Sequence, residues 1–458
     1  MQATLTHAPS VDVTRQLACF FAAARYADLP ADAVAAAQRG VLDWLGCALA
    51  GSRHPTLDIL LAVASEFNGQ AQATVLGRQC RIGLLEAALV NGQAGHVLDY
   101  DDTHMAGVVL HASSPVLAAL FALSESSESP GSRAVSGADL ITAYAIGFEA
   151  GVRIGQASPG HHKGGWHLTG TLGTLAASAA SAKLLGLDEQ QMIYALGIGG
   201  TQAAGMQQNR GTMCKSFHAG RAASSGVLSA RLAQKNFNSA EDIVEGKRGF
   251  CRTFSDVAAP ELALLELGTR WEIVRNGLKP YACGVVLHPA IDALIAIRSG
   301  AGFTGAAIDE VSLRVHPLVM SITGLPNPDT GLKSKFSIYH SAAVALLDGA
   351  AGVAQYSDGR AGAAEVVALR QKIVVTADES LRTDEAHARV VSHDGAVFEK
   401  HVPHATGTAA NPMLDAAVHD HVAAFAFPFT PTGGLNFVQS HPCTMRRMSL
   451  MDRSARSR

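Results

Sequence analysis

The chain has 458 residues, of which 48% are apolar and 16% are charged, and its formal net charge is −3. Disordered proteins combine low hydrophobicity with high charge, so this composition excludes that class and predicts a large buried core. Basic residues form no block before the last few positions, which argues against a nucleic-acid-binding protein.

The seven cysteines are widely scattered and form no CxxC motif. This pattern predicts a reducing compartment and offers no local zinc or iron–sulfur ligand set. The first residues lack the order of a signal peptide, and no uninterrupted apolar stretch reaches the ~18 residues of a membrane span. We therefore expect a cytoplasmic protein that has no membrane segment.

From residue 12 to 268, apolar residues recur at spacings of three and four, which predicts helices. The expected helices are 31–50, 55–67, 83–98, 137–154, 170–185 and 188–206. Ser136 and Asp188 are typical N-caps for two of them. Residues 169–187 are almost all small, and helices of this kind pack closely in a core. The first half is thus predicted to be an all-helical domain.

The sequence pattern changes near residue 270. From there on, segments rich in β-branched residues, with partial alternation of apolar and polar positions, predict short strands. The expected strands are 271–275, 310–316, 372–377 and 388–393, with helices at 336–353 and 361–369. The predicted fold class is mainly α, with a large all-helical domain over 1–268 and a smaller α+β domain over 269–399. A C-terminal return to the helical domain over 400–425 is left open. Residues 426–458 are predicted to be an irregular or disordered tail, either as a flexible basic tail or because of a reading-frame change.

The first candidate site lies in residues 91–104, NGQAGHVLDYDDTH, which contain Asp99, Asp101 and Asp102. Carboxylates this close raise one another's pKa, so a fold keeps them as a base, as metal ligands or as helix caps. His111 precedes Ser-Ser-Pro and an apolar helix. It is therefore expected at a helix N-terminus, where the dipole disfavours the imidazolium ion.

The second candidate contains His161, His162 and His167. No carboxylate or cysteine lies nearby in the sequence, which argues against a metal site. A histidine is more often a hydrogen-bonded structural residue than a catalytic one. His167 is the preferred candidate because it directly precedes the small-residue helix, where a bound anion would fit.

The third candidate is a run of basic residues, Lys215, His218 and Arg221, spaced by three. On the first two turns of a helix these side chains would form one stripe, and a stripe at a helix start can bind a carboxylate. The alternative is a solvated face, but the flanking Ala/Gly/Ser-rich sequence favours a core position. Weaker signals are Lys279 and the segment KFSIYH that contains Tyr339 and His340, near the expected domain junction.

Six sequence blocks resemble, in order and approximate spacing, the MmgE/PrpD family. They are NGQAGHVLDYDDTH, HASSPVLAAL, WHLTGTLG, GTMCKSFHAGRAASSGVL, KPYACG with LHPAIDAL, and KFSIYHSAAVALLDG, and the resemblance covers about residues 12–413. The family includes 2-methylcitrate dehydratases, cis-aconitate decarboxylases and iminodisuccinate epimerases. The resemblance implies a large helical domain with a smaller α+β lid domain, paired as a homodimer.

The resemblance also implies site residues. Catalytic roles are implied for Asp99, His111, His167 and Lys215, and His340 is added because it stands where the family has a tyrosine. Substrate-binding roles are expected for Thr103, His218, Arg221, Lys279 and Tyr339. No metal and no other cofactor is expected.

These family activities share proton transfer at a carbon next to a carboxylate, which fixed cations can stabilise and imidazole can catalyse near neutral pH. We therefore expect a cofactor-independent lyase acting on a small di- or tricarboxylate, with dehydration of 2-methylcitrate as the leading activity. Decarboxylation of cis-aconitate and epimerisation of an amino-dicarboxylate use the same pocket. A non-catalytic helical scaffold is the alternative from a different class. The expected partners are a polycarboxylate and a second copy of the chain, with no nucleic acid and no membrane.

Overall fold

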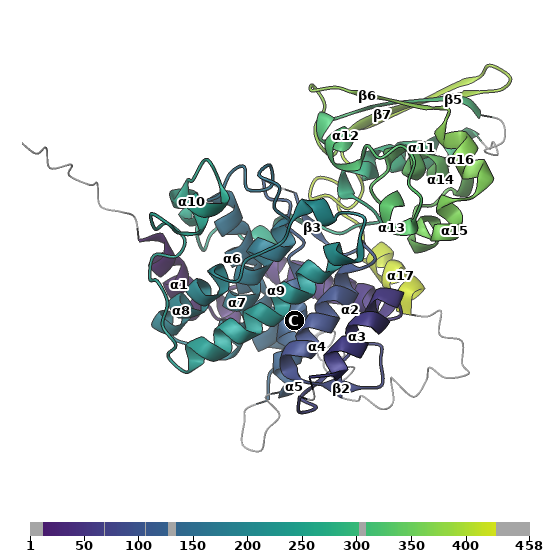
Figure 1. The fold of residues 1–458 in the computed structure, drawn as a ribbon. Helices are drawn as coiled ribbons and strands as arrows, with labels where there is room; N and C mark the ends of the chain where they lie inside the picture. The colour runs from purple at the N-terminus through teal and green to yellow at the C-terminus, as the bar shows by residue number, and fades with distance from the viewer. Residues whose placement is uncertain (1–11, 68, 106, 127–133, 302–307, 427–458) are drawn as a thin grey trace, which may run out of the picture.

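The computed structural model describes residues 12–67, 69–105, 107–126, 134–301 and 308–426. Figure 1 shows a helical part in purple to teal and a mixed part in green, while the yellow C-terminal helix lies back against the helical part. The fold class is mainly α with a smaller α+β part, as the sequence predicts.

The helical part also holds two short antiparallel pairs, β1 (Ala73–Thr74) with β2 (Arg81–Ile82) and β3 (Thr103–His104) with β4 (Asn276–Gly277). Its helices are α1 (Val13–Ala23), α2 (Ala31–Gly51), α3 (Pro55–Ser65), α4 (Leu84–His96), α5 (Ser113–Ser126), α6 (Gly137–Gln156), α7 (Leu168–Leu184), α8 (Glu189–Gly200), α9 (Met213–Gln234) and α10 (Phe250–Phe254). The six predicted helices are all present, and Ser136 and Asp188 both cap as expected.

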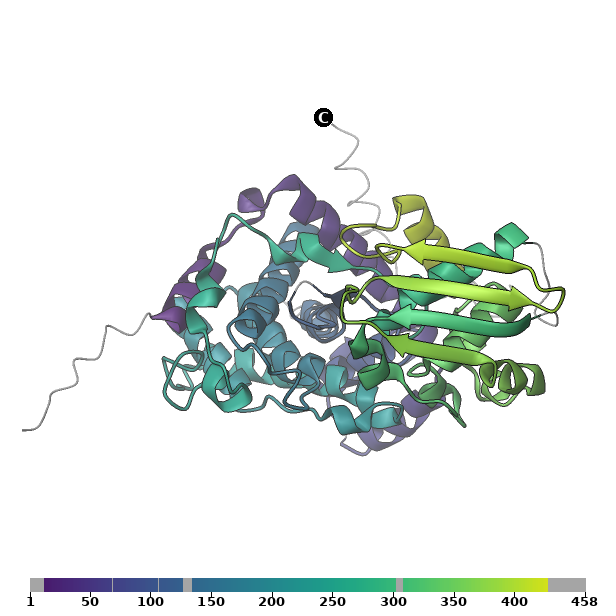
Figure 2. The same cartoon turned by 90° about the horizontal axis from the view of Figure 1, so that it is seen from above.

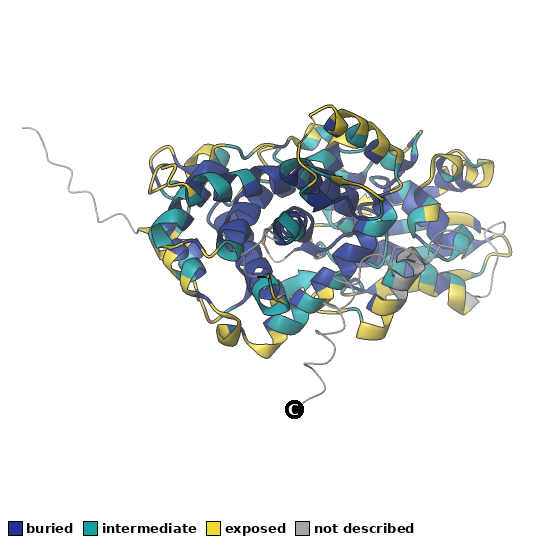
Figure 3. Ribbon diagram, turned by 90° about the horizontal axis from the view of Figure 1, so that it is seen from below, coloured by how far each residue is buried: buried dark blue, intermediate teal, exposed yellow. Residues whose placement is uncertain are grey.

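Helix α7 is the centre of the helical core. Every residue from Leu168 to Ala182 is buried, and the helix packs against α5, α6, α8 and α9. Small residues make this close packing possible: a Cβ atom on Gly147 of α6 would lie only 2.7 Å from the Cβ atom of Ala180. Figure 3 shows the buried positions filling the interior of the helical part. The prediction of a small-residue core helix is confirmed.

The α+β part contains a four-stranded sheet with the order β6-β5-β7-β8. Strand β5 is parallel to β6 and antiparallel to β7, and β8 is antiparallel to β7. The strands are β5 (Ile308–Val315), β6 (Ile373–Ala377), β7 (Ala386–Ser392) and β8 (Val397–Val402), and the helices are α11 (His288–Ala301), α12 (Pro317–Thr323), α13 (Gly331–Ser334), α14 (Ile338–Asp348), α15 (Asp358–Ala361) and α16 (Ala364–Arg370). Figure 2 shows the four strands side by side, and α11 packs against β7 and β8.

One strand prediction is wrong, and one strand was not predicted. In place of the predicted strand 271–275, the residues Glu272–Arg275 form a short 3-10 helix. The bulky side chains of Trp271 and Ile273 suggested a strand, but they are buried in the core of the helical part. Strand β8 was not predicted, since its sequence VFEKHV carries charges. Charged side chains are typical of an edge strand, which is the position of β8 in the sheet.

The two parts share one hydrophobic cluster. Val90 and Val97 from the α4 region pack in the same cluster as Leu287 and Ile291 from the α11 region. The last helix, α17 (Asp415–Ala426), packs against α2. The predicted tail lies, after residue 426, outside the described residues. Across the described ranges, no helix is both long and apolar enough to span a bilayer.

Candidate active site

The turn after α4 holds a buried carboxylate against two ammonium groups. Asp99 has a φ angle of 52°, in the left-handed region that aspartate tolerates better than most residues. Its Oδ1 accepts hydrogen bonds from Nζ of Lys215 on α9 at 2.9 Å and from Nζ of Lys279 at 2.8 Å. Lys279 also donates to the backbone oxygen of Asp99 at 3.1 Å. Three segments far apart in the sequence therefore meet at one carboxylate.

This group is charged near neutral pH. Burial alone would raise the pKa of Asp99, but the ammonium groups of Lys215 and Lys279 hold it well below its usual range. Burial lowers the pKa of Lys215, whereas the carboxylates of Asp99 and Asp101 outweigh burial and raise the pKa of Lys279. Among the described residues, Oδ2 of Asp99 has no hydrogen-bond partner although it is buried.

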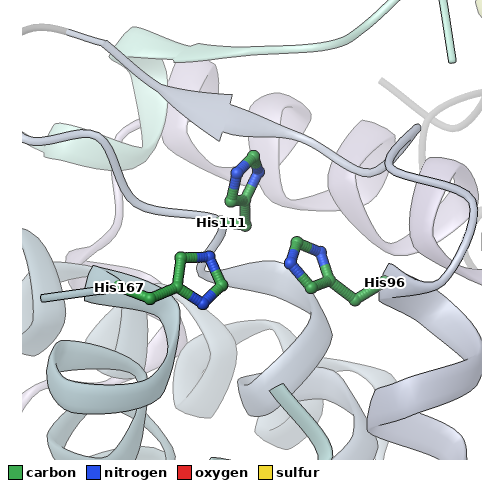
Figure 4. A group of neighbouring side chains, drawn as sticks. All are labelled: His96, His111 and His167. Carbon is green, nitrogen blue, oxygen red and sulfur yellow. The ribbon is translucent and has the colours of Figure 1, made fainter. Parts of the chain in front are cut away.

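Next to this ion group, three buried histidines from different segments face a common space (Figure 4). The ring centroids of His96 and His111 are 4.8 Å apart, those of His96 and His167 are 5.7 Å apart, and those of His111 and His167 are 6.3 Å apart. His96 ends α4, His111 precedes α5, and His167 is the residue before α7. The fold thus assembles the histidines at three helix ends.

Each of the three rings is held through its Nδ1 atom. Nδ1 of His96 lies 2.8 Å from Oδ2 of Asp101, and Nδ1 of His111 lies 2.8 Å from the backbone oxygen of Asp102 and 2.9 Å from the hydroxyl of Thr103. Nδ1 of His167 lies 2.9 Å from Nδ1 of His218.

Burial keeps these imidazoles neutral. It lowers the pKa of His96 and, more strongly, the pKa of His111 and of His167, and the nearby Lys215 acts in the same direction on all three. The carboxylate of Asp101 opposes this effect at His96 but does not overcome it. Neutral imidazoles can accept a proton, so the group is a set of bases in a positively charged surrounding.

A small pocket opens between the two parts at this point. It is lined by His96, Val97, Asp99, Gly211, Thr212, Lys215, Ser216, Leu332, Lys335 and Phe336. Lys215 and Ser216 lie in the first turn of α9, and Gly211 and Thr212 directly precede the helix, which Thr212 caps by accepting from the backbone N–H of Cys214. The positive end of the dipole of this 22-residue helix faces the pocket and favours a bound anion.

Lys335 brings a second ammonium group to the pocket wall. Its Nζ donates to the backbone oxygens of Leu98 and Ala282, each at 2.7 Å, and lies 5.0 Å from the ring centroid of Tyr356. Burial lowers the pKa of Lys335 to about 8. At neutral pH the pocket wall therefore carries the positive charges of Lys215 and Lys335, and Lys279 lies behind Asp99.

Comparison of the sequence with known protein families identifies the family of this chain. Residues 15–263 match the MmgE/PrpD N-terminal domain, and residues 281–432 match the MmgE/PrpD C-terminal domain. This chain belongs to the MmgE/PrpD family.

Three proteins of known name are similar in sequence to this MmgE/PrpD protein. The cis-aconitate decarboxylase-like protein oryM of Aspergillus oryzae is 33% identical over 62% of this chain and 61% of its own length. The cis-aconitate decarboxylase of Aspergillus terreus is 29% identical over 82% of this chain and 81% of its own length. The 2-methylcitrate dehydratase of Salmonella typhimurium is 25% identical over 75% of this chain and 73% of its own length. By name, these relatives are a cis-aconitate decarboxylase, a protein similar to one, and a 2-methylcitrate dehydratase, and decarboxylases and dehydratases are both lyases.

In this MmgE/PrpD protein the structure brings most of the predicted site residues together. Seven of them form one contiguous buried group: Asp99, Thr103, His111, His167, Lys215, His218 and Lys279. Their chemical roles stay predictions.

Three predicted residues lie elsewhere. Arg221 is exposed, because six residues turn a helix by about 600°, which places Arg221 about 120° away from Lys215 on α9. His340 is buried on α14, where its Nε2 lies 2.8 Å from the backbone oxygen of Gln355. Tyr339 is half-buried and packs against the hydrophobic cluster that the two parts share. Neither His340 nor Tyr339 lines the pocket, so this placement does not support their predicted roles.

Sequence reasoning missed two pocket residues of this MmgE/PrpD protein. His96 lies inside the motif that contains Asp99, but no role was predicted for it. Its position five residues before Asp101 was the available signal, since a helix end followed by a tight turn can bring these two side chains together. Lys335 was noted only as part of the KFSIYH segment, and nothing local in the sequence indicates that it reaches Leu98 across the junction.

Proposed function

We propose that this protein is a lyase that acts on a small polycarboxylate bound in the pocket between the two parts. The observation that carries the proposal is the excess of buried positive charge: the three ammonium groups of Lys215, Lys279 and Lys335 lie close to the two ionised carboxylates of Asp99 and Asp101. Buried charge is costly unless it is paired. An anionic substrate supplies the missing negative charge, and the start of α9 adds to the attraction.

Decarboxylation of a cis-aconitate-type tricarboxylate is the leading reaction. It is supported by two relatives that carry the decarboxylase name and have higher identity to this chain than the dehydratase has. The reaction breaks a bond between carbon and a carboxylate, releases CO₂, and leaves an electron pair that must be stabilised until a proton reaches the carbon skeleton. Fixed ammonium groups next to the remaining carboxylates stabilise this charge in a buried site.

The histidines supply the proton transfer. His96 lines the pocket, and its Nδ1 is held by the carboxylate of Asp101, which orients the ring and stabilises the imidazolium form when it arises. His111 and His167 lie beside it and can pass a proton on. Asp99 acts mainly by holding Lys215 and Lys279 in place.

Dehydration of 2-methylcitrate, the leading activity expected from the sequence, is the second candidate. It is favoured by the 25% identity to a named 2-methylcitrate dehydratase. In this reaction a base removes a proton from carbon while an acid protonates the departing hydroxyl group. Two histidines on different sides of the substrate could serve as this pair.

One assay distinguishes the two reactions. The purified protein is incubated separately with cis-aconitate, 2-methylcitrate and citrate, and CO₂ release and alkene absorbance are recorded. We expect CO₂ release from cis-aconitate. Alkene formation without CO₂ from 2-methylcitrate would instead establish the dehydratase, and no reaction with any of the three would contradict the proposal.

The Lys215→Ala variant tests the binding site itself. Removing one stabilising group from a charged intermediate typically lowers the rate about 100- to 1,000-fold, so we expect a loss of that size in kcat/KM. Lys400→Ala, which removes an exposed lysine on β8, is the matched control and should have unchanged kinetics. Unchanged kinetics in Lys215→Ala would rule out this assignment.

We also propose the homodimer that the family resemblance implies. Sedimentation equilibrium measures it directly, because a dimer has twice the 47.6 kDa mass of the chain. A single species at the mass of one chain would contradict it.

A further inference from the structure

A group of side chains of the kind that bind metal ions lies on the four-stranded sheet, outside the pocket. Glu385 directly precedes β7, His387 lies in β7, and His401 lies in β8. One ligand atom of each of these side chains lies within 4.8 Å of those of the other two. None of the three lines the pocket, so the proposed lyase chemistry makes no use of them.

The register of the sheet places the three side chains on one face. Helices α11 and α14 lie on one side of the sheet, and Figure 2 shows the opposite side unobstructed. Along β7, Ala386 and Ala388 are buried in the hydrophobic cluster that the two parts share. Glu385 and His387 occupy the alternate positions and therefore lie on the opposite face. His401 is the direct partner of His387 in the antiparallel pair of β7 and β8, so both rings lie on this face.

The three side chains are already in contact. The ring centroids of His387 and His401 are 4.1 Å apart, with an angle of 3° between the ring planes, and Nε2 of His401 lies 2.9 Å from Oε1 of Glu385. Two imidazoles held this close repel each other when both are protonated, whereas two neutral rings offer lone pairs to one shared ion. Burial, His401 and the guanidinium group of Arg314 lower the pKa of His387, which favours its neutral form.

The two arginines beside the group are both paired with carboxylates. Arg314 on β5 forms an ion pair with Asp378, and Nη2 of Arg382 lies 3.2 Å from Oε2 of Glu385. The other oxygen of Glu385, Oε1, is the one directed at His401. The positive charge near the group is thus compensated, and a cation can be accepted at Oε1.

We propose that Glu385, His387 and His401 form a binding site for a divalent transition-metal ion of the zinc class. Two imidazoles and a carboxylate are a ligand set that Zn²⁺ favours, and a fourth position stays open for water. Bonds of about 2.0–2.1 Å in a tetrahedral site place the ligand atoms about 3.4 Å apart, so these atoms need to approach by no more than about 1.4 Å. The ion joins β7 to β8 and stabilises the edge of the sheet. The sequence-based expectation of no metal considered ligands close together in the chain, whereas this site combines two strands.

Zinc binding to the full-length protein tests the proposal without any substrate, so its outcome is independent of whether the protein proves to be a lyase. The protein is freed of metal with a chelator and desalted, and Zn²⁺ binding is measured by equilibrium dialysis at pH 7.5. His387→Ala and His401→Ala should each weaken the binding of one Zn²⁺ per chain at least about tenfold, which is the smaller effect seen when even a supporting residue of a metal site is lost. His419→Ala, which removes an exposed histidine on α17, is the matched control and should bind as the wild type does.

A second measurement needs no variant of the site. Diethyl pyrocarbonate modifies accessible neutral imidazoles, and mass spectrometry locates the modified residues. Zinc should protect His387 and His401 from modification and leave the modification of His419 unchanged. Thermal unfolding without metal verifies that the alanine variants fold. Failure to bind zinc at micromolar concentration, full retention of zinc in His387→Ala, or equal modification of His401 with and without zinc would each overturn the proposal.

Discussion

Lys335 differs from Lys215 and Lys279 in what it contacts. Lys215 and Lys279 both pair with the carboxylate of Asp99, whereas Lys335 donates to two backbone oxygens and lies over the ring of Tyr356. Carbonyl dipoles compensate a buried ammonium group less completely than a carboxylate does. This explains why burial lowers the pKa of Lys335 to about 8 while the pKa of Lys279 is raised.

The lowered pKa predicts a pH effect on substrate binding. Lys335 is charged below about pH 8 and loses its proton above it, so KM for the polycarboxylate should rise as the pH increases from 7 to 9. A hydrogen bond to a charged group contributes about 1.5–3 kcal/mol, so Lys335→Met should raise KM about 10- to 100-fold at pH 7 and show little further change up to pH 9. Lys400→Met is the control on the exposed surface. Parallel KM profiles for the wild type and Lys335→Met would exclude Lys335 as the titrating group.

The buried side chain of His161 should make the protein less stable at acidic pH. Its ring is buried among Trp166, Phe250 and Phe254, and burial lowers its pKa to about 3. Between pH 6.5 and about 3 the unfolded chain binds a proton at this position and the folded chain does not. The free energy of unfolding should therefore fall as the pH decreases through this range, by up to about 1.4 kcal/mol per pH unit from this residue.

The variant His161→Phe keeps an aromatic ring but cannot bind a proton. Denaturant unfolding at pH 7, 6 and 5 should show a flatter decline for this variant than for the wild type. If wild type and His161→Phe lost stability at the same rate, His161 would have to be charged in the folded protein or titrate near its ordinary pKa.

Site residues that lie in a short local motif could be predicted from the sequence, whereas those that depend on distant partners could not. Asp99, His111, His167 and Lys215 could be selected because each lies in a short motif beside a helix end. His96 and Lys335 could not, since their importance comes from partners that the turn after α4 and the junction bring close. Arg221 lies on the exposed surface because a spacing of three, taken twice, leaves the face of the helix on which Lys215 lies, and its binding role stays a prediction.

Among the elements, the crossing of α4 and α9 positions the two sides of the site. α4 carries His96 and leads into Asp99, while α9 carries Lys215. The helices approach through glycines: a Cβ atom on Gly92 would lie 2.7 Å from Cα of Gly220, and one on Gly220 would collide with the backbone oxygen of Leu89. The distance between Lys215 and Asp99 thus depends on the absence of side chains at this crossing.

The variant Gly220→Ala should therefore lower both the stability of the protein and its kcat/KM. Forcing extra atoms into a close-packed contact costs about 1–3 kcal/mol, and the shift of α9 would move Lys215 relative to Asp99. Urea unfolding and kcat/KM measure the two effects. Gly300→Ala is the matched control: this helical glycine is exposed with no atom within 4 Å of an added Cβ, so alanine should be neutral or slightly stabilising. Equal stability of the two variants would contradict the close-packing argument.

Elements were predictable where periodicity and capping agreed. The helices after Ser136 and Asp188 begin where their caps indicate, because the cap satisfies backbone N–H groups that lie next to it in sequence. Strand β8 and the turn at Glu272–Arg275 were not predictable, because their side-chain pattern depends on tertiary neighbours. An edge strand is half-solvated and carries charges, and a buried turn carries bulky apolar residues.

For the whole molecule, the shared hydrophobic cluster decides how the two parts unfold. Val97 and Leu98 belong to the same cluster as Leu287 and Ile291, and the hydroxyl of Tyr100 donates to the backbone oxygen of Pro280 at 2.7 Å. Separate unfolding of the α+β part would expose this cluster and leave Asp99 without Lys279. Parts joined by a large apolar interface are expected to unfold together, unlike parts joined by a small polar one.

We therefore predict one cooperative unfolding transition in urea. The three tryptophans, Trp44, Trp166 and Trp271, all lie in the helical part, so their fluorescence reports that part alone. Pulsed hydrogen exchange of the β7 amides reports the sheet, and its midpoint should coincide with the fluorescence midpoint.

Two valine variants test the role of the shared cluster. Val97→Ala removes apolar contact from this cluster and should lower the free energy of unfolding by about 1 kcal/mol or more, with an equal shift of both midpoints. Val374→Ala, at an exposed position of the sheet, should change neither midpoint by much. Exchange of β7 at a urea concentration where the fluorescence is still native would show that the sheet unfolds on its own and that the junction is weaker than its apolar contacts indicate.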